Sequence, residues 1–358
     1  MQDELIRKTI LSIRGGNDEY HAQAKRHLDS LTKPIGSLGV LEEVAAQYVA
    51  WREEKTPVIS RKAVYVFAAD HGITAEGISA YPRDVTPQMV YNFLNGGAAI
   101  NVLARQAHSD VVIVDVGVDA NFQDAEGLVK RKIRRGSRNF AKEAAMTVEE
   151  VQAALRVGIE TAEQAKQRGR TLVALGEMGI GNTTSASAIA AALTGLPAAQ
   201  LTGRGTGLDA ERCARKAQVI DQALAMHFPE RPAVVPDALE VLRRVGGLEI
   251  AAIAGMVLGA AARRIAVVID GFICTAGAAV ACALAPNARA AIFAGHLSEE
   301  PGHGVLLDRM NLTPLLQLKM RLGEGSGAAL AFHVIEASVH IYNEMATFES
   351  AGISKADH

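Results

Sequence analysis

Two glutamates in this chain lie in glycine turns, where a carboxylate is unexpected. Glu177 lies within "GEMGIGNTTS", and Glu324 lies within "RLGEGSGAAL". Glycines allow a ligand to approach the backbone closely, and amides at the start of a following helix can bind a phosphate. A carboxylate would repel that phosphate unless it has another task. Glu177 would suit stabilisation of positive charge on a sugar, whereas Glu324 is either catalytic or a helix-start acid favoured by the helix dipole.

Two glycine-rich turns could each bind a phosphate. The second turn, "TGRGTGLD", begins at Thr202 and precedes a helical pattern that carries Lys216. Together the turns fit a nucleotide monophosphate, although each alone could be a tight strand-to-helix turn and Lys216 could be an ordinary solvated lysine. Arg321 could pair with Glu324 or with the phosphate. The candidate residues of the turns are Gly179, Gly181, Asn182, Thr183 and Gly205.

The common nucleotide-binding motifs are excluded. A Walker A loop needs Lys after its last glycine, and Asn182 stands there. The dinucleotide fingerprint has a different order of glycines. Asp70 and His71 could ligate a metal, but a pair without further ligands at matching spacing is more often structural or substrate-orienting. We therefore expect no metal and no cofactor.

Composition indicates a globular protein with a core of Ala, Val, Leu and Ile, since hydrophobic residues make up 49% and aromatic residues only 4%. The net charge of −2 gives no field that would attract nucleic acid or a membrane surface. The charged N-terminus lacks a signal-peptide core, so we expect a cytoplasmic protein. We expect the three cysteines to be buried thiols. Leu248 to Ala285 resembles a membrane span, but Arg263, Arg264 and Asp270 interrupt it, which favours a buried helix, strand and helix.

Short apolar runs alternate with helical patterns along most of the chain. The runs are continuously apolar, which is typical of strands buried on both faces, and the alternation predicts an α/β fold with a parallel, doubly wound sheet flanked by helices. Ligands bind beyond the carboxyl ends of such strands. Polar and glycine residues follow the runs at Asp70–Gly72, Asp115–Gly117, Gly176–Gly179, Asp270–Gly271 and Gly295–His296, so a shared site is expected there.

Both ends of the chain are predicted to be helical. Gly39 to Glu54 shows one-face apolar spacing, and Ser326 to Phe348 is apolar on most sides. We expect a large α/β domain at residues 61–325 and a small helical domain formed by residues 1–60 with 326–358.

Several motifs together resemble the nicotinate-nucleotide:dimethylbenzimidazole phosphoribosyltransferase family. Each motif alone is weak, but their combination and order are specific from about Leu31 to the last helix. The motifs are "LTKPIGSLGVLE", "AADHGI", "SAYPRDVTPQMV", "GGAAIN", "GEMGIGNTT", "TGRGTGLD", "DGFI" and "RLGEGSGAAL".

This resemblance implies transfer of the 5-phosphoribosyl group of nicotinate mononucleotide to 5,6-dimethylbenzimidazole, with inversion, giving α-ribazole 5′-phosphate and nicotinate for cobalamin assembly. It implies a Rossmann-like sheet and a homodimer. It assigns Glu324 as the catalytic base and Glu177 as a second active-site acid. It places the base pocket at Ser79, Tyr81 and Gln88. Expected phosphate contacts are Gly179, Gly205, Lys216 and Arg321, with Ser298 nearby.

Two other functions fit some of the same residues. A nucleoside hydrolase or phosphorylase would use similar charge stabilisation with water or phosphate as the nucleophile. A non-catalytic nucleotide-binding module would bind a ligand without turnover, and it would leave Glu177 and Glu324 without a role.

Overall fold

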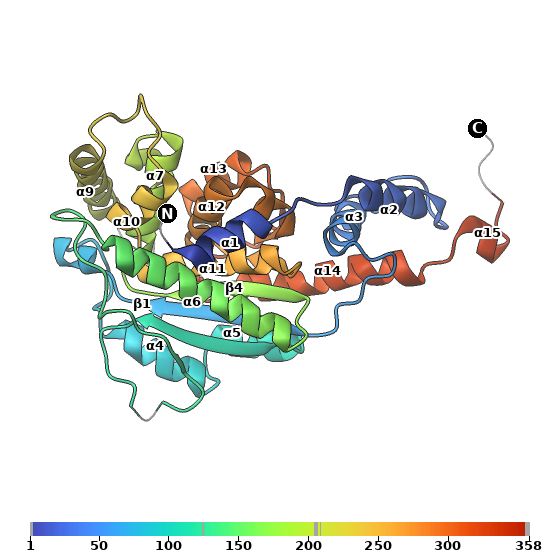
Figure 1. The fold of residues 1–358 in the computed structure, drawn as a ribbon, viewed down its shortest axis with the longest axis horizontal. Helices are drawn as coiled ribbons and strands as arrows, with labels where there is room; N and C mark the ends of the chain where they lie inside the picture. The colour runs from blue at the N-terminus through green and yellow to red at the C-terminus, as the bar shows by residue number, and fades with distance from the viewer. Residues whose placement is uncertain (1–2, 124, 204–206, 208, 355–358) are drawn as a thin grey trace.

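The described part of the computed structural model, residues 3–123, 125–203, 207 and 209–354, is built on a seven-stranded sheet in the order β3-β2-β1-β4-β5-β6-β7 (Figure 1). Every neighbouring pair is parallel, which confirms the predicted doubly wound α/β fold. The strands are β1 Lys62–Ala69, β2 Asp110–Gly117, β3 Val129–Lys130, β4 Leu172–Met178, β5 Ala266–Ile269, β6 Ile292–His296 and β7 Pro314–Leu316.

Helices surround this sheet and extend beyond it. In the first half of the chain they are α1 Glu4–Ser12, α2 Asp18–Ser30, α3 Val40–Arg52, η1 Gly72–Glu76, α4 Val85–Leu94, α5 Ala99–Gln106 and α6 Val148–Gln167. The second half contains α7 Asn182–Thr194, α8 Ala198–Leu201, α9 Ala210–His227, α10 Ala238–Val245, α11 Leu248–Ala262, α12 Phe272–Leu284, η2 Pro286–Ala291, α13 Pro301–Arg309, α14 Ser326–Glu344 and α15 Phe348–Ala351.

The sheet is covered on both faces. Helix α11 lies against the central strands and α6 packs against it, while α4, α5 and α14 contact the sheet from the other side (Figure 1). The α6–α11 contact is close because Gly158 and Gly255 lie at the crossing, where an added Cβ would collide with the backbone of the opposite helix. Burial on both faces explains why the strands are continuously apolar.

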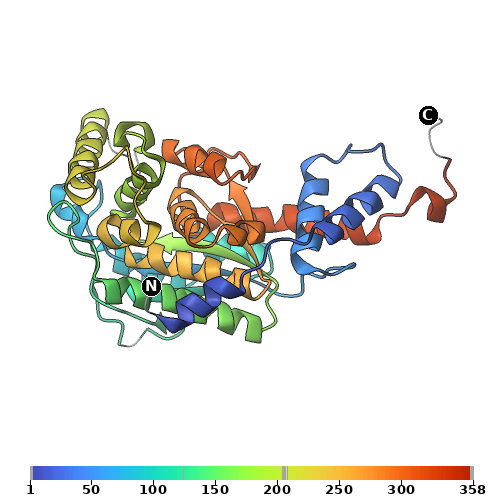
Figure 2. The same ribbon diagram turned by 45° about the horizontal axis from the view of Figure 1, so that its top comes forward.

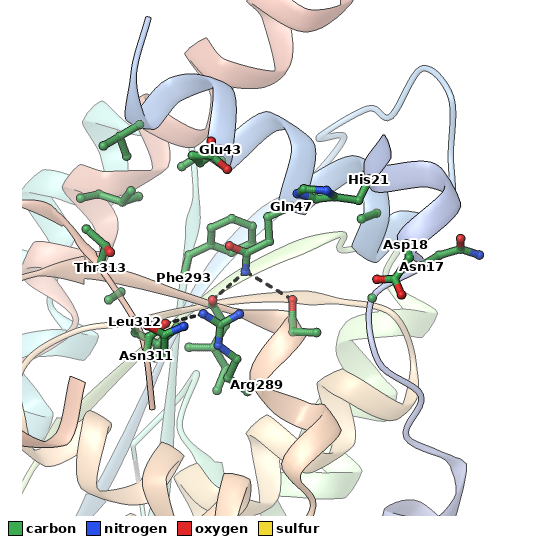
Figure 3. Close-up of a pocket in the computed structure, with 18 residues that line it drawn as sticks. Asn17, Asp18, His21, Glu43, Gln47, Arg289, Phe293, Asn311, Leu312 and Thr313 are labelled. Atoms are coloured by element: carbon green, nitrogen blue, oxygen red, sulfur yellow. Dashed lines mark hydrogen bonds between the residues drawn. The ribbon is translucent and has the colours of Figure 1, made fainter. Parts of the chain in front are cut away.

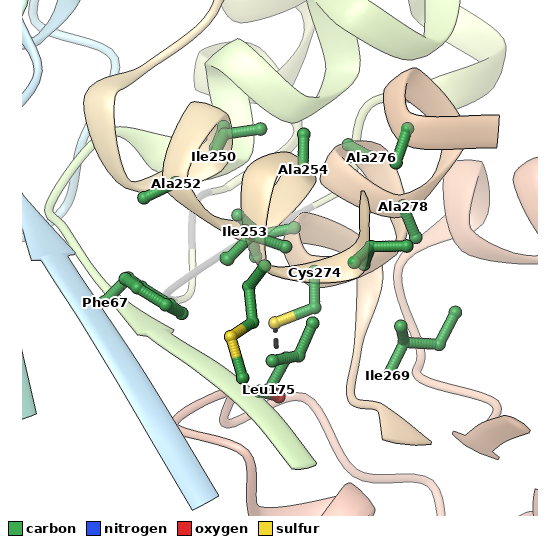
Figure 4. Close-up of a cluster of buried hydrophobic side chains, with 14 of the residues drawn as sticks. Phe67, Leu175, Ile250, Ala252, Ile253, Ala254, Ile269, Cys274, Ala276 and Ala278 are labelled. Carbon is green, nitrogen blue, oxygen red and sulfur yellow. Dashed lines mark hydrogen bonds between the residues drawn. The ribbon is translucent and has the colours of Figure 1, made fainter. Parts of the chain in front are cut away.

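The core lies where α11 and α12 meet the sheet. Ile253 and Cys274 pack near Leu175 and Phe67, and the Cys274 thiol lies 3.4 Å from the carbonyl oxygen of Leu175 (Figure 4). The predicted helix, strand and helix of Leu248 to Ala285 are α11, β5 and α12. None of the described helices is both long and apolar enough to cross a membrane.

One expectation from the sequence was wrong, and two features of the fold were not predicted. Cys213 and Cys282 are only half-buried, because their helices place them near the surface, so Cys274 alone is a buried thiol. The stretch from Thr86 to His108, whose apolar pattern alone is typical of one helix, forms two helices, since Gly96 has a φ of 76° and separates α4 from α5. The strands β3 and β7 were not expected because they are too short to show a pattern.

The helices α2 and α3 and the end of α14 form an extension beside the sheet (Figure 2). They share a separate apolar cluster. Helix α1 instead packs on α6 and α11. Helix α3 is buried on two sides, because Tyr48 and Trp51 join the main core while Ala45 and Val49 join the separate cluster. The domain division itself stays a prediction; these contacts favour a small unit that excludes α1.

Candidate active site

The carboxyl ends of the parallel strands bring the expected polar residues to one edge of the sheet. Asp70 and His71 follow β1, Asp115 lies near the end of β2, and Glu177 is the penultimate residue of β4. Asp270 follows β5 directly. This is the edge at which ligands bind in parallel α/β sheets.

Glu324 is held in a backbone conformation that is rare for a residue with a side chain. Gly323, Glu324 and Gly325 all have positive φ, at 89°, 65° and 88°. For an L-residue other than Gly, Asn or Asp this is an uncommon, strained state that is enriched at functional sites. Gly176 in β4 permits it, because a Cβ there would collide with the backbone carbonyl of Glu324. The segment that carries Glu177 and the glycine turn that carries Glu324 are therefore in contact.

The carboxyl group of Glu324 points toward the start of α5. Its Oε2 accepts a long hydrogen bond from the Ile100 N–H at 3.4 Å. Burial raises the pKa of Glu324, and the nearby charge of Asp270 raises it further. The hydrogen bond from the Ile100 N–H lowers this pKa, but by less than burial raises it. Within the described residues, no ion pair joins Arg321 to Glu324, and Arg321 is exposed. Glu324 is thus a buried acid next to a helix N-terminus.

Glu177 is the most perturbed acid of this edge. Burial is the largest cause that raises the pKa of Glu177 to about 8, and the charges of Glu249, Asp270 and Glu324 add to it. A hydrogen bond from the Asn182 side-chain amide opposes that shift. The side chain also lies against Gly323, where a Cβ would collide with it. Glu177 and Glu324 therefore face the same small region.

Asp270 anchors the helix that follows Glu324. Its Oδ2 accepts the Gly325 N–H at 3.1 Å, and its Oδ1 accepts the N–H groups of Gly327 and Ala328 at 2.7 and 3.0 Å. The His296 ring lies 3.4 Å from the same carboxylate. A buried acid bound to first-turn amides stabilises the start of a helix. The sequence analysis named Asp270 as a strand-end residue, as a charge in an apolar stretch and as the first residue of "DGFI", but it did not predict this anchoring role.

His71 belongs to a buried structural pair. Its Nε2 lies 2.6 Å from Oε1 of Glu249, its Nδ1 lies 3.0 Å from the Ser185 hydroxyl, and the side chains of His71 and Glu249 are fully buried. Ser185 lies in the first turn of α7, so this pair links α7 to the starts of α11 and η1. Within the described residues, no group of three or more His, Cys, Asp or Glu could hold a metal ion.

Lys216 is buried beside the glycine turn that leads into α7. It is 1% exposed, and its Nζ donates to the Thr183 hydroxyl at 2.8 Å. Burial lowers the pKa of Lys216 to about 8, while the charge of Glu300 works in the opposite direction. This is not the solvated lysine considered as the alternative. A buried cation at the N-terminus of α7 suits an anionic ligand.

His303 fixes the side chain of Ser298. The Ser298 N–H donates to His303 Nδ1 at 3.0 Å, so that nitrogen carries no proton. Nε2 is therefore the protonated nitrogen, and it lies 3.0 Å from Thr275 Oγ1. Burial lowers the pKa of His303 to about 3, which keeps the ring neutral. The Ser298 hydroxyl lies 2.8 Å from the same Nδ1, in a turn between β6 and α13.

Comparisons with known proteins agree with this arrangement. A family model described as phosphoribosyltransferase matches residues 13–353. A nicotinate-nucleotide–dimethylbenzimidazole phosphoribosyltransferase from Geobacter sulfurreducens is 54% identical over 354 residues, which are 99% of each chain. The chain belongs to this phosphoribosyltransferase family.

Further comparisons give the same result for this phosphoribosyltransferase. A relative of the same description from Chloroflexus aggregans is 50% identical over 98% of each chain. The crystal structure of CobT from Thermus thermophilus superposes with a TM-score of 0.90 at 49% identity, and the match covers 94% of this chain and 100% of that chain.

The residues expected to bind the aromatic base lie at the surface of this phosphoribosyltransferase. The Ser79 hydroxyl donates to the carbonyl oxygen of Tyr81 at 3.1 Å, and Tyr81 is 51% exposed. Gln88 is exposed on α4. A pocket built on these residues is therefore open in this structure. Gly205, expected at the phosphate, lies outside the described residues.

A cavity of about 470 Å³ lies elsewhere in this phosphoribosyltransferase, between α2–α3 and the start of β6 (Figure 3). The Gln47 amide donates to the carbonyl oxygen of Ile292 at 2.9 Å, and Arg289 donates to backbone carbonyls of Met310 and Asn311. The side chains of Gln47 and Arg289 therefore hydrogen-bond to the backbone and stabilise the fold here. The cavity touches the amino end of β6, opposite the acid cluster, and is not the candidate active site.

Proposed function

We propose that this chain transfers the 5-phosphoribosyl group of nicotinate mononucleotide to 5,6-dimethylbenzimidazole, giving α-ribazole 5′-phosphate and nicotinate. The observation that carries the proposal is the pair of buried acids, Glu177 and Glu324, brought together by the two glycine turns at the ligand-binding edge. Relatives that cover nearly the whole chain bear the name of this activity. The binding-module alternative leaves both acids without a role, and the names of the relatives favour the transferase over the hydrolase.

The acid cluster fits the charge of the first substrate. Nicotinate mononucleotide carries its ribose on a cationic pyridinium nitrogen, and positive charge spreads onto the ribose as that bond breaks. Glu177 would be largely protonated at neutral pH, since its pKa is about 8. A bound cation favours the ionised form of a nearby acid, so the substrate itself would restore the negative charge of Glu177. We assign Glu177 to charge stabilisation.

Glu324 is assigned as the general base. One nitrogen of the benzimidazole attacks C1′, while Glu324 removes the N–H proton from the other nitrogen. The C1′–nicotinate bond breaks, and its electron pair returns to the pyridine nitrogen. An acid with a raised pKa is a stronger base than an exposed glutamate, which suits proton removal near neutral pH. Attack from the face opposite nicotinate converts a β-glycoside into an α-product in a single displacement.

The 5′-phosphate is assigned to the N-terminus of α7. Gly179, Gly181 and Thr183 offer backbone amides there, and Lys216 offers a buried cation in contact with Thr183. The Asn182 N–H already donates to the Gly179 carbonyl oxygen at 3.1 Å, so its side-chain amide is the group assigned to the substrate. Ser298 and the exposed Arg321 are further phosphate contacts that the family resemblance implies. Gly205 remains part of this proposal from the resemblance alone.

The test is a chromatographic assay of purified protein with nicotinate mononucleotide, with and without dimethylbenzimidazole. We expect nicotinate and ribazole phosphate to form together only when the base is present. Nicotinate released without added base would support a hydrolase. Ligand binding without turnover would support the binding module.

We also propose that the protein works as a homodimer in the cytoplasm, as the family resemblance implies. Light scattering coupled to size-exclusion chromatography would measure the mass directly. A mass close to 37.8 kDa would contradict the dimer.

A further inference from the structure

Thr86 joins two segments of the candidate site that are far apart in the sequence. It lies in the first turn of α4 and is fully buried. Its hydroxyl oxygen accepts the N–H of Ile180 at 3.1 Å. Ile180 lies in the glycine turn between β4 and α7. Secondary structure alone does not require this bond, because α4 has no side-chain cap and Ile180 lies outside any helix or strand.

The Thr86 hydroxyl also acts on Asp70, the acid that follows β1. It stabilises the ionised form of Asp70 and so lowers the pKa of that carboxyl group, against the larger effect of burial. Asp70 accepts the N–H of Asp119 with Oδ2 at 2.7 Å, while its Oδ1 is buried and has no hydrogen-bond partner among the described residues. The Thr86 hydroxyl therefore binds the glycine turn directly and influences the acid at the end of β1.

The segments that meet at Thr86 carry groups assigned to different substrates. Ser79 and Tyr81 precede α4, and Gln88 follows Thr86 by two residues on the same helix. On the other side, Ile180 lies three residues after Glu177 and two residues before α7 begins. Displacement of α4 would therefore move the base-binding side chains relative to the ribosyl phosphate site.

We infer that Thr86 is a positioning residue that fixes the base-binding segment against the phosphoribosyl site. The inference rests on the proposed function. The attacking nitrogen must lie in line with the bond that breaks, and a misplacement of about 1 Å by a residue outside the chemistry can cost about 10²-fold in rate. Each substrate would still bind its own segment, so alignment rather than affinity depends on the hydroxyl.

The test uses two substitutions at one position and a matched control. Thr86→Val keeps the shape and removes the hydroxyl, whereas Thr86→Ser keeps the hydroxyl. The control is Thr161→Val in α6, which removes a buried hydroxyl that donates to the Val157 carbonyl oxygen at 2.7 Å, away from the site. The thermal midpoint of each variant is measured beside its kinetics.

We expect Thr86→Val to lower kcat about 10- to 100-fold, with smaller changes in KM for either substrate. Thr86→Ser should stay within about threefold of the parent, and Thr161→Val should keep the parent kcat even if its midpoint falls. Equal kcat in Thr86→Val and Thr161→Val would overturn the inference. Loss in Thr86→Ser as large as in Thr86→Val would also overturn it, because packing rather than the hydroxyl would then matter.

Amide hydrogen exchange separates this inference from the proposed function. Because Thr86 accepts the Ile180 N–H, Thr86→Val should speed exchange at Ile180 and Thr86→Ser should preserve its protection. If the parent protein forms no ribazole phosphate, the proposed function fails, while this exchange still reports whether the link exists. Faster exchange at Ile180 with an unchanged kcat would show that the link has no positioning role.

Discussion

At the scale of single side chains, the carboxyl group of Glu324 is buried beside other acids and accepts one long hydrogen bond, from the Ile100 N–H at 3.4 Å. An amide in its place would keep the shape but could not take a proton. We expect Glu324→Gln to lower kcat by about 10²- to 10⁴-fold while KM for nicotinate mononucleotide changes little. Steady-state kinetics measure both values.

The matched control for that change is Glu344→Gln, at an exposed position near the end of α14. It should retain parent activity. If Glu324→Gln kept full activity, the role of general base would pass to Glu177.

Glu177 gives the stability of the protein a specific pH dependence. Its pKa is about 8 in the folded protein, above the ordinary value of 4.5. Between those values the folded state holds a proton that the unfolded state has lost, so the free energy of unfolding falls as pH rises through this range. We expect Glu177→Gln to remove this slope, and the variant to gain stability relative to the parent from pH 5 to pH 8.

Urea unfolding at a series of pH values measures that difference. Titration of this one group can change the free energy of unfolding by at most about 1.4 kcal/mol for each pH unit. A difference that stays constant from pH 5 to pH 8 would show that Glu177 titrates normally in the folded protein.

At the scale of elements, the contact between β4 and the turn before α14 decides where both acids lie. Gly176 allows this contact, since a Cβ would strike the Glu324 carbonyl. We expect Gly176→Ala to push the turn away and lower kcat on the order of 10²-fold. The control is Gly304→Ala in α13, where a Cβ meets only ordinary contact with Leu297. Similar kinetics for the two variants would contradict the role of this contact.

The elements themselves were largely predictable, because buried parallel strands leave continuous apolar runs and helices leave a 3.6-residue period. The contacts between elements were not. Asp270 binds amides more than fifty residues later in the chain, and Thr86 binds an amide more than ninety residues later. No local pattern records such pairs. The burial of Lys216 was equally hidden, since its helix carries Arg212 and Arg215 beside it, both exposed.

The candidate site was predictable to the extent that glycine turns and family motifs mark it. Glu177 and Glu324 were singled out because a carboxylate is unusual in such turns. The start of α5, which faces Glu324, lies in the motif "GGAAIN", but none of its residues was predicted as a site residue, because the apolar pattern alone runs on across Gly96. The open position of Tyr81 could not be predicted, because exposure depends on how the loop before α4 folds.

At the scale of the whole molecule, the extension formed by α2, α3 and the end of α14 has its own apolar cluster, separate from the main core. Leu28 is almost fully buried there. We expect Leu28→Ala to destabilise the extension by about 2–5 kcal/mol. Amide exchange should rise in α2 and remain slow in the strands.

The control for this experiment is Leu11→Ala, whose side chain is exposed. It should leave exchange unchanged throughout the chain. Faster exchange in the sheet of Leu28→Ala would show that the extension and the sheet unfold together as one cooperative unit.

The left-handed backbone at Glu324 also bears on protein engineering. A left-handed conformation costs about 1–2 kcal/mol for a residue with a Cβ, and glycine would remove that cost together with a buried acid. Glycine at this position should therefore make a more heat-resistant protein that has lost its base. Directed evolution for thermal tolerance alone would favour such inactive variants. A selection for a more heat-resistant enzyme must therefore measure product formation in every round.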